Sequence, residues 1–306
     1  MRGGEKGTIL MIALWILAIL MLLTVSLAYR ASLEIKLSSL TARRIRAREM
    51  AREEIYRLAR ILKNDKNAYD ALNEEWALSR GEEPISYTFQ DEERKINLNT
   101  FPREVLSALP GVGEEIASAI IDWRDTDDIP LPGGAEDIYY ISLNPPYHCK
   151  NKLLESMEEL QAIKGVTPEL FRTLESIATI YGHGKLNINT ASEETLGVLL
   201  TGLGSPLSLR DKIILYRQGL DGIEGSADDN IFDAIMTVKQ KLQPNGLIPE
   251  EEAAIDTMIN RNLIEVKSNC YRVSLKAVLE GKYKCEVKAV LSKNESSPIK
   301  IVYWKE

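Results

Sequence analysis

The sequence predicts an α+β fold in which a long N-terminal helix packs on a small antiparallel sheet, with a mostly α-helical domain inserted between the strands. Three observations predict it. An apolar run over residues 8–29 is followed by a helical pattern that extends to residue 63. No Pro or Gly interrupts residues 8–63, which is typical of one long helix. Apolar and polar residues alternate over residues 85–98 and again from residue 263, as in strands. The residues between follow a helical period broken by Gly and Pro.

The first helix begins with a candidate membrane anchor. Residues 8–29 contain no ionisable side chain, and about 20 apolar residues are enough to cross a bilayer. The run does not end at an Ala-x-Ala-like site, as a cleaved secretory signal would. A helix over residues 8–63 would be on the order of 80 Å long, which is more than a membrane requires. A single-pass anchor carrying an unrelated soluble domain is the simpler alternative.

Beyond the anchor, the helix carries an apolar stripe. Its members recur at steps of three and four residues: Leu33, Leu37 and Leu40, then Ala51, Ile55, Leu58 and Leu62. This spacing places them on one face of the helix, so we expect the stripe to pack against protein. The arginines between residues 43 and 52 fall on other faces.

The strand-like segments predict two hairpins and one further strand. Alternating residues cover 85–89 and 96–98 around a polar turn at 91–94, then 271–279 and 283–291 around a turn at 280–281, with a last strand near 299–303. A lone two-stranded hairpin is marginally stable in water. We therefore expect both hairpins to join one sheet, with the helical block inserted between them. Three domains in series is the alternative.

The helical block contains an internal repeat. Lys95-Ile-Asn-Leu-Asn-Thr100 matches Lys185-Leu-Asn-Ile-Asn-Thr190, and each copy leads to a helix, a Gly-x-Gly hairpin and a second helix. The two hairpins cover residues 109–113 and 200–204, and a weaker third covers 163–167. Such units are helix-hairpin-helix motifs, as found in SAM-like domains.

Helix-hairpin-helix units often bind DNA, because hairpin amides at a helix N-terminus meet a phosphate and nearby cations add affinity. A membrane-anchored DNA-binding or DNA-uptake protein is therefore the alternative function. Glu114 and Glu115 follow the first hairpin, and no cation follows the second before Arg210. The net charge of −7 also argues against a polyanion as main partner. We therefore expect these units to contact protein rather than nucleic acid.

Two acidic loops are candidate calcium sites. In the first, Asp125, Asp127 and Asp128 precede a Pro/Gly turn that returns to Glu136. Calcium takes six to eight oxygen ligands from flexible loops, although the spacing here is not that of an EF-hand. A solvated acidic loop is the alternative. In the second loop, Asp221, Asp228 and Asp229 could converge on another ion, and a polar turn is an equal alternative.

Histidine and cysteine use argues against catalysis. His148 and His183 lie in loop-like sequence, and no nucleotide-binding, zinc-binding or redox motif is present. We therefore predict that the chain is not an enzyme. Three cysteines are too few for a disulfide-built fold. If one bridge forms, Cys270 and Cys285 are the expected pair, although their register does not place them directly opposite.

The N-terminus resembles that of a type IV pilin-like precursor: a charged stub ending in Gly7, an apolar run and a long helix. The resemblance implies that a prepilin peptidase cuts after Gly7 and leaves Thr8 first. Most such chains carry Glu at the fifth mature position, which here is Ile12. The absence of this Glu resembles the type II secretion minor pseudopilin K family, general secretion pathway protein K. The acidic stretch 122–147 resembles the same family in its Asp-Trp-x-Asp-x-Asp, Gly-Ala-Glu, Tyr-Tyr and Pro-Pro-Tyr segments.

This resemblance implies calcium in the helical domain, carried over to Asp125, Asp127 and Glu136, together with Asp122 and Asp128. It also implies five parts: a leader 1–7, a membrane half 8–29, the rest of the helix and first hairpin 30–98, an inserted helical domain 99–260, and C-terminal strands 261–306.

The function implied is that of a minor pseudopilin at the tip of the type II secretion pseudopilus, which initiates or caps the fibre during secretion across the outer membrane. The implied partners are other minor pseudopilins, the major pseudopilin and prepilin peptidase, with secreted cargo or the outer-membrane secretin as further contacts. The implied location is the inner membrane, with the bulk in the periplasm. The flanking Lys and Arg residues by themselves favour the opposite orientation.

Overall fold

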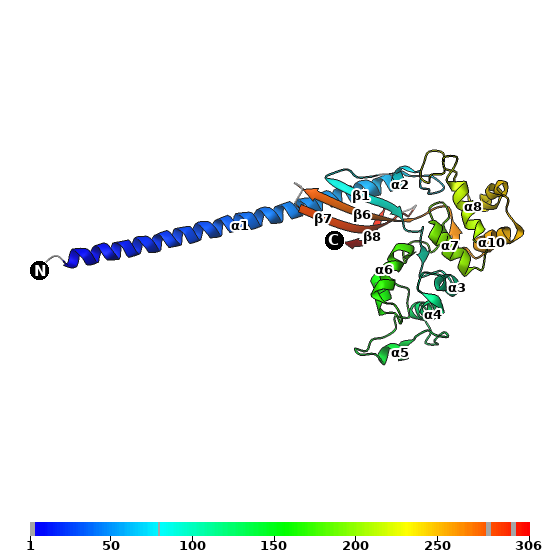
Figure 1. The fold of residues 1–306 in the computed structure, drawn as a ribbon, viewed down its shortest axis with the longest axis horizontal. Helices are drawn as coiled ribbons and strands as arrows, with labels where there is room; N and C mark the ends of the chain where they lie inside the picture. Colours follow the sequence, from blue (N-terminus) through cyan, green and yellow to red (C-terminus); the bar gives the residue numbers. More distant parts are fainter. Residues whose placement is uncertain (1–3, 79, 280–282, 295–297) are drawn as a thin grey trace.

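A single helix projects from the globular part of the molecule (Figure 1). The computed structural model describes residues 4–78, 80–279, 283–294 and 298–306. Helix α1 (Gly4–Asn64) is continuous over 61 residues, as predicted. It contains a segment apolar and long enough to cross a membrane, with a mean hydropathy of 2.8. Gly7 and Thr8 lie within α1, whereas part of the predicted leader lies outside the described residues.

The second half of α1 covers one face of a four-stranded antiparallel sheet. The strands are β1 (Ile85–Asp91), β6 (Cys270–Leu279), β7 (Tyr283–Ser292) and β8 (Lys300–Lys305), in the order β1-β6-β7-β8. Period-two alternation sends Tyr87, Val273 and Val287 toward α1, and these side chains are buried. The predicted strands around residues 271–279, 283–291 and 299–303 are confirmed, and the turn at 280–281 lies outside the described residues.

The apolar stripe of α1 is divided between two environments. Ala51, Ile55, Leu58 and Leu62 are fully buried against the sheet. Leu33, Leu37 and Leu40 lie nearer the N-terminus and outside the core between α1 and the sheet, and their exposed fractions are 46%, 54% and 40%. The stripe is therefore part core and part uncovered surface within this one chain.

Truncating the two halves of the stripe should give different results. Leu58→Ala removes a fully buried side chain from the helix–sheet interface, so we expect the free energy of unfolding to fall by about 2–5 kcal/mol. Leu37→Ala removes an exposed one and should change it by less than about 0.5 kcal/mol. Chemical denaturation of the full chain in detergent measures both. Equal losses would show that the exposed half is also packed within the monomer.

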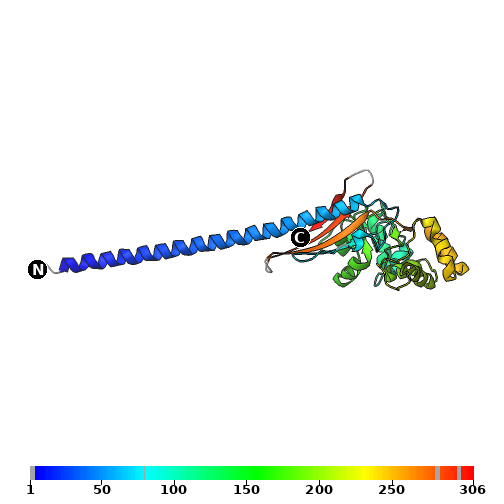
Figure 2. The same cartoon turned by 90° about the horizontal axis from the view of Figure 1, so that it is seen from above.

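The chain between β1 and β6 is mostly helical. Its helices are α3 (Arg103–Ser107), α4 (Gly113–Arg124), α5 (Asp137–Ile141), α6 (Pro168–Ile177), α7 (Glu193–Gly202), α8 (Ser208–Arg217), α9 (Val238–Leu242) and α10 (Pro249–Asn260), with 3-10 turns at Met157–Ala162, Ile235–Thr237 and Gln243–Asn245. A short helix α2 (Glu75–Leu78) precedes β1. The helical block has its own core, distinct from that between α1 and the sheet. Figure 2 shows it at the end of the molecule far from the N-terminus.

The predicted hairpin at 85–98 is wrong. β1 pairs with β6 along its whole length, and β2 (Ile96–Asn97) pairs in parallel with β3 (Ala178–Thr179). The expected polar turn is buried instead, because Asp91 continues the inward-facing row of Tyr87 and Phe89. Residues 91–94 therefore carry the chain from the sheet into the helical block.

The internal repeat is reproduced in the backbone. β4 (Leu186–Asn187) pairs in parallel with β5 (Ile264–Glu265), as β2 does with β3. In each copy the first Asn accepts a backbone N–H two residues later, at 2.8 Å for Asn97 and 2.9 Å for Asn187. Each copy also contains an arginine at the end of its second helix, half-buried at Arg124 and buried at Arg217. Arg124 donates to the carbonyls of Leu98 and Phe101, and Arg217 donates to those of Ile188 and Ala191.

The expected Cys270–Cys285 disulfide is not formed. Cys270 lies opposite Ser292 and Cys285 lies opposite Ala277 in the β6–β7 ladder, so the two are separated along the strands. All three cysteines are free thiols in the described chain.

Candidate metal centre

Three carboxylates from the first acidic loop converge at one point. Asp122 lies in the last turn of α4, Asp125 follows that helix, and Glu136 precedes α5. One oxygen of each lies within 4.8 Å of the others. Asp122 and Glu136 are buried and Asp125 is half-buried.

The loop returns because Asp122 holds it. Its carboxylate accepts the backbone N–H of Leu131 at 3.2 Å and that of Ala135 at 2.7 Å. Gly134 makes this approach possible, since a Cβ there would lie 1.9 Å from an Asp122 oxygen. The return brings Glu136 back over the end of α4. The Pro/Gly turn seen in the sequence therefore has the expected role.

Two of the three carboxylates have oxygens without hydrogen-bond donors. Both oxygens of Glu136 and Oδ1 of Asp125 are buried and have no hydrogen-bond partner within the described residues. Burial, then the charges of Asp122 and Asp125, raises the pKa of Glu136 to about 7. The pKa values of Asp122 and Asp125 are also raised, chiefly by burial. Buried carboxylates without donors are costly unless a cation neutralises them.

The ligand atoms available at this site suit a hard cation. The thiol of Cys149 lies against the backbone oxygen of Asp122, but burial raises its pKa to about 11, so it remains protonated. The ligands available are thus carboxylate oxygens, which calcium prefers.

Two other predicted ligands serve different contacts. Asp127 accepts the N–H of Ile129 at 2.9 Å, and Asp128 accepts from the amide of Asn151 at 2.8 Å. The carboxylate group given by the structure contains Asp122, Asp125 and Glu136, without Asp127 and Asp128. Asp122 took its predicted role from the family resemblance alone, because its place on α4 is not visible in loop composition.

The second acidic loop is arranged differently. Asp228 accepts the N–H groups of Leu220 and Asp221, and Asp229 accepts that of Gly225 at 2.7 Å. Within the described residues, these aspartates with Asp221 do not form a group whose ligand atoms all lie within 4.8 Å. The carboxylates fold their own loop, in agreement with the polar-turn alternative.

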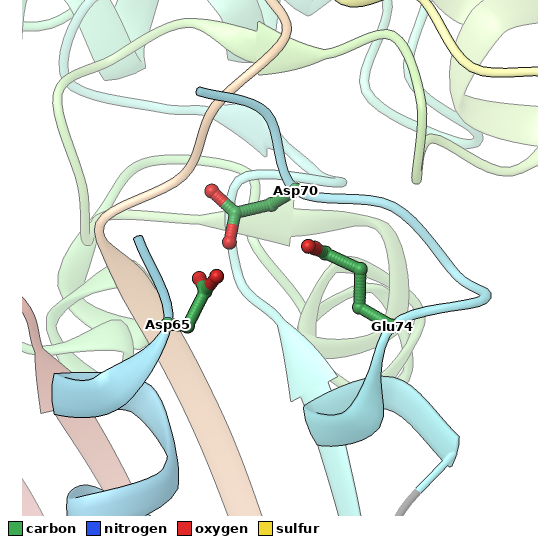
Figure 3. A group of neighbouring side chains, drawn as sticks. All are labelled: Asp65, Asp70 and Glu74. Atoms are coloured by element: carbon green, nitrogen blue, oxygen red, sulfur yellow. The ribbon is translucent and has the colours of Figure 1, made fainter. Parts of the chain in front are cut away.

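A further acidic group was missed from the sequence. Asp65, Asp70 and Glu74 turn toward one another between the end of α1 and α2 (Figure 3). Each has donors: Lys293 pairs with Asp65 at 2.8 Å, Tyr271 donates to Asp70 at 2.6 Å, and Trp76 donates to Glu74 at 2.9 Å. No local pattern would have found the group, since the donors to Asp70 and Asp65 lie 201 and 228 residues away in the sequence. The group is explained as a polar junction.

Comparisons with known proteins agree with the predicted family. Residues 94–183, which include the first repeat and the carboxylate group, match the family model described as type II secretion system (T2SS), protein K. A protein K homologue from Escherichia coli (strain K12) is 27% identical over 219 residues, covering 62% of this chain and 66% of the relative. Type II secretion system protein K from Aeromonas hydrophila is 37% identical over 89 residues, covering 28% of this chain and 27% of the relative. The chain is thus similar to members of the type II secretion system protein K family, as predicted.

The alignments thus span less than two thirds of these two relatives. The fold is also similar to a chain in the crystal structure of the GspK-GspI-GspJ complex from the enterotoxigenic Escherichia coli Type 2 Secretion System. The TM-score is 0.66 at 17% identity, and the match covers 90% of this chain and 98% of that chain. At this identity the likeness concerns the fold.

Buried polar groups join the sheet to the helical block. The carboxylate of Asp91, at the end of β1, accepts from Asn187 at 3.1 Å, Thr190 at 2.5 Å and Ser268 at 2.6 Å. Ser268 also donates its N–H to Asp70 at 2.8 Å. Three segments that are distant in sequence therefore meet at one carboxylate, which fixes the helical block on the sheet.

The same junction should make stability depend on pH. Burial, then the charge of Asp91, raises the pKa of Glu93 to about 8. Between about pH 4.5 and 8 the folded state keeps a proton that the unfolded chain releases, so the free energy of unfolding should fall as pH rises across this range. We expect a loss of about 1–3 kcal/mol from Glu93, and a flatter profile for Glu93→Gln.

Denaturation of the full chain in detergent and excess calcium, at pH values from 5 to about 8, measures this dependence. Glu75→Gln, at an exposed carboxylate, should leave the profile as in the wild type. A Glu93→Gln profile parallel to that of the wild type would mean that Glu93 is ionised throughout.

Proposed function

We propose that this chain is a minor pseudopilin of the type II secretion machinery, placed at the tip of the pseudopilus, where it initiates or caps the fibre. The observation that carries the proposal is α1, whose membrane-length half is free of the globular part in a chain that is similar to protein K. The relatives named above are secretion-system components, which agrees with the prediction that the chain is not an enzyme.

The proposed assembly uses the uncovered half of the helix stripe. Leu33, Leu37 and Leu40 are apolar and 40–54% exposed, so they can pack on helices of neighbouring subunits. The GspK chain of similar fold was crystallised with GspI and GspJ. We take the corresponding minor pseudopilins as partners here, with the major pseudopilin below them. The anchor would lie in the inner membrane and the globular part in the periplasm.

The helical block would form the broad head of the tip. We propose that its two helix-hairpin-helix-like units contact protein, including secreted cargo or the outer-membrane secretin. Glu114 and Glu115 lie in the first turn of α4, where a DNA phosphate would have to bind, and they repel it. The relatives' names give no support to the DNA-binding alternative.

We further propose that Asp122, Asp125 and Glu136 hold a calcium ion in this head. The support is the group of buried carboxylate oxygens without donors. A bound divalent cation would neutralise the three charges and fix the loop between α4 and α5. The same residues also position the loop. Asp122 on α4 accepts hydrogen bonds from the backbone of residues 131 and 135, and Glu136 directly precedes α5.

Intact mass of the protein extracted from membranes tests the assembly role. Cleavage by prepilin peptidase should remove residues 1–7 and leave Thr8 first, and any methyl group on that amine would appear in the same spectrum. Co-purification with the GspI-like and GspJ-like subunits of the same cell should follow. A native chain that keeps its first seven residues and purifies alone would contradict the proposal.

A further inference from the structure

One face of the sheet carries an accumulation of cations. α1 covers the other face, and the outward-facing row across β6, β7 and β8 contains Ser274, Lys288 and Lys305 as register neighbours. Arg272 and Lys276 lie two positions to either side of Ser274 on β6. Like charges on neighbouring positions of one sheet face are destabilising. The arrangement therefore costs stability within the monomer.

Two adjoining hollows lie on this face. The first has a volume of about 480 Å³, and the second has a volume of about 420 Å³. They share Ser274 and Lys288, so they are continuous along the strands. The second extends from the sheet to α6, where Arg172 lines it, and to Arg94 in the crossing into the helical block. It is lined by five Lys and Arg residues and one Glu.

We call Arg94, Arg172, Arg272, Lys276, Lys288 and Lys305 the basic face. Arg272 is paired with the buried Glu92, and Lys305 is paired with Glu158 at 3.2 Å. The side chains of the other four make no hydrogen bond or ion pair with any described residue. Glu175, Glu286 and Glu306 line the same hollows and offset part of their charge.

An excess of cations thus gathers in a concave surface of a chain whose net charge is −7. A cleft lined by one sign of charge concentrates its field and attracts the opposite sign. The cations are spread out: Arg272 and Lys276, four residues apart on β6, are separated by about 14 Å. This spread fits several separate anionic groups on an extended ligand better than one compact anion.

We propose that the basic face binds an acidic segment of a partner polypeptide in an extended conformation. Carboxylates four residues apart in such a segment have the same spacing as the β6 cations. Glu158, Glu175 and Glu286 around the face would repel the continuous phosphate chain of a nucleic acid, whereas a peptide can place neutral residues beside them. The proposal does not depend on the secretion role.

Fluorescence anisotropy with the full-length chain in detergent tests it, with a fluorescein-labelled decaglutamate peptide as the probe and labelled oligo(dT) of equal length for comparison. At about 0.15 M salt the peptide should bind more tightly than the DNA. The double variant Arg172→Glu/Lys288→Glu, at two exposed and unpaired side chains, should weaken peptide binding about tenfold. The matched control is Arg60→Glu/Lys152→Glu, which reverses two exposed cations away from the face and should bind like the wild type.

Three results would overturn the proposal: no peptide binding by the wild type, equal weakening in both double variants, or DNA binding as tight as that of the peptide. Because the substituted side chains are exposed, their thermal melts should match the wild type. A difference in binding between the two double variants would then report the surface rather than the fold.

Discussion

Calcium should raise the melting temperature of this protein by roughly 5–10 °C when its free concentration is about 100 times the dissociation constant. Such an excess stabilises the folded state by about 2.7 kcal/mol. One kcal/mol corresponds to about 2–4 °C for a chain of this size. The physical reason is the repulsion among Asp122, Asp125 and Glu136, which a cation relieves.

Glu136→Gln separates this cause from a general salt effect. The variant loses a ligand, so the calcium-dependent shift should largely disappear. It also loses a buried like charge, so its melting temperature in chelator should lie above that of the wild type. Differential scanning fluorimetry in calcium and in chelator measures both, with Asp211→Asn at an exposed carboxylate as the control. Identical melts of the wild type in calcium and in chelator would exclude the site.

Arg217→Met should destabilise the chain by about 3–5 kcal/mol. Arg217 is 2% exposed, and its guanidinium donates to the carbonyls of Ile188 and Ala191 and pairs with Glu224. Met fills a similar volume but leaves two carbonyl groups without donors. The second repeat uses this arginine to join its first loop to its last helix, so the loss should spread through the helical block.

Arg210→Met on the same helix is the matched control. Arg210 pairs with Glu193 and Asp211, whose side chains are 66% and 64% exposed, so its removal should cost less than about 1 kcal/mol. Denaturant titration of both variants gives the comparison. Arg124→Met should behave like Arg217→Met, because Arg124 holds the carbonyls of Leu98 and Phe101 in the first repeat. A small effect at Arg217 would mean that water replaces the guanidinium there.

The acidic loop illustrates how far sequence reasoning reached. Composition located the candidate region between residues 122 and 136, and the Pro/Gly turn indicated that the loop returns. Composition could not show which of the five carboxylates face one another, since this depends on which oxygens accept hydrogen bonds from other groups. Asp127 and Asp128 have donors, whereas Glu136 has none within the described chain.

For the first strand, the sequence predicted the element but not its pairing partner. Alternation identified Ile85–Asp91 as a strand, but proximity in sequence suggested the wrong partner. Asp91 lies on the same face as Tyr87 and Phe89, which is a sign that it is buried. A local hairpin would have left it unpaired, and its partners Asn187, Thr190 and Ser268 are about a hundred residues or more away.

The sequence by itself determined the long helix, the alternating strands, the duplicated Asn-x-Asn segments and the resemblance to the protein K family. These depend on periodicity and on short motifs, which adjacent residues encode. The tertiary structure alone decided that β1 pairs with β6, that Asp122, Asp125 and Glu136 meet, and that half of the α1 stripe stays uncovered. The reason is that burial and hydrogen-bond satisfaction are properties of the whole packed chain, so a residue's partner is set by what remains unpaired elsewhere.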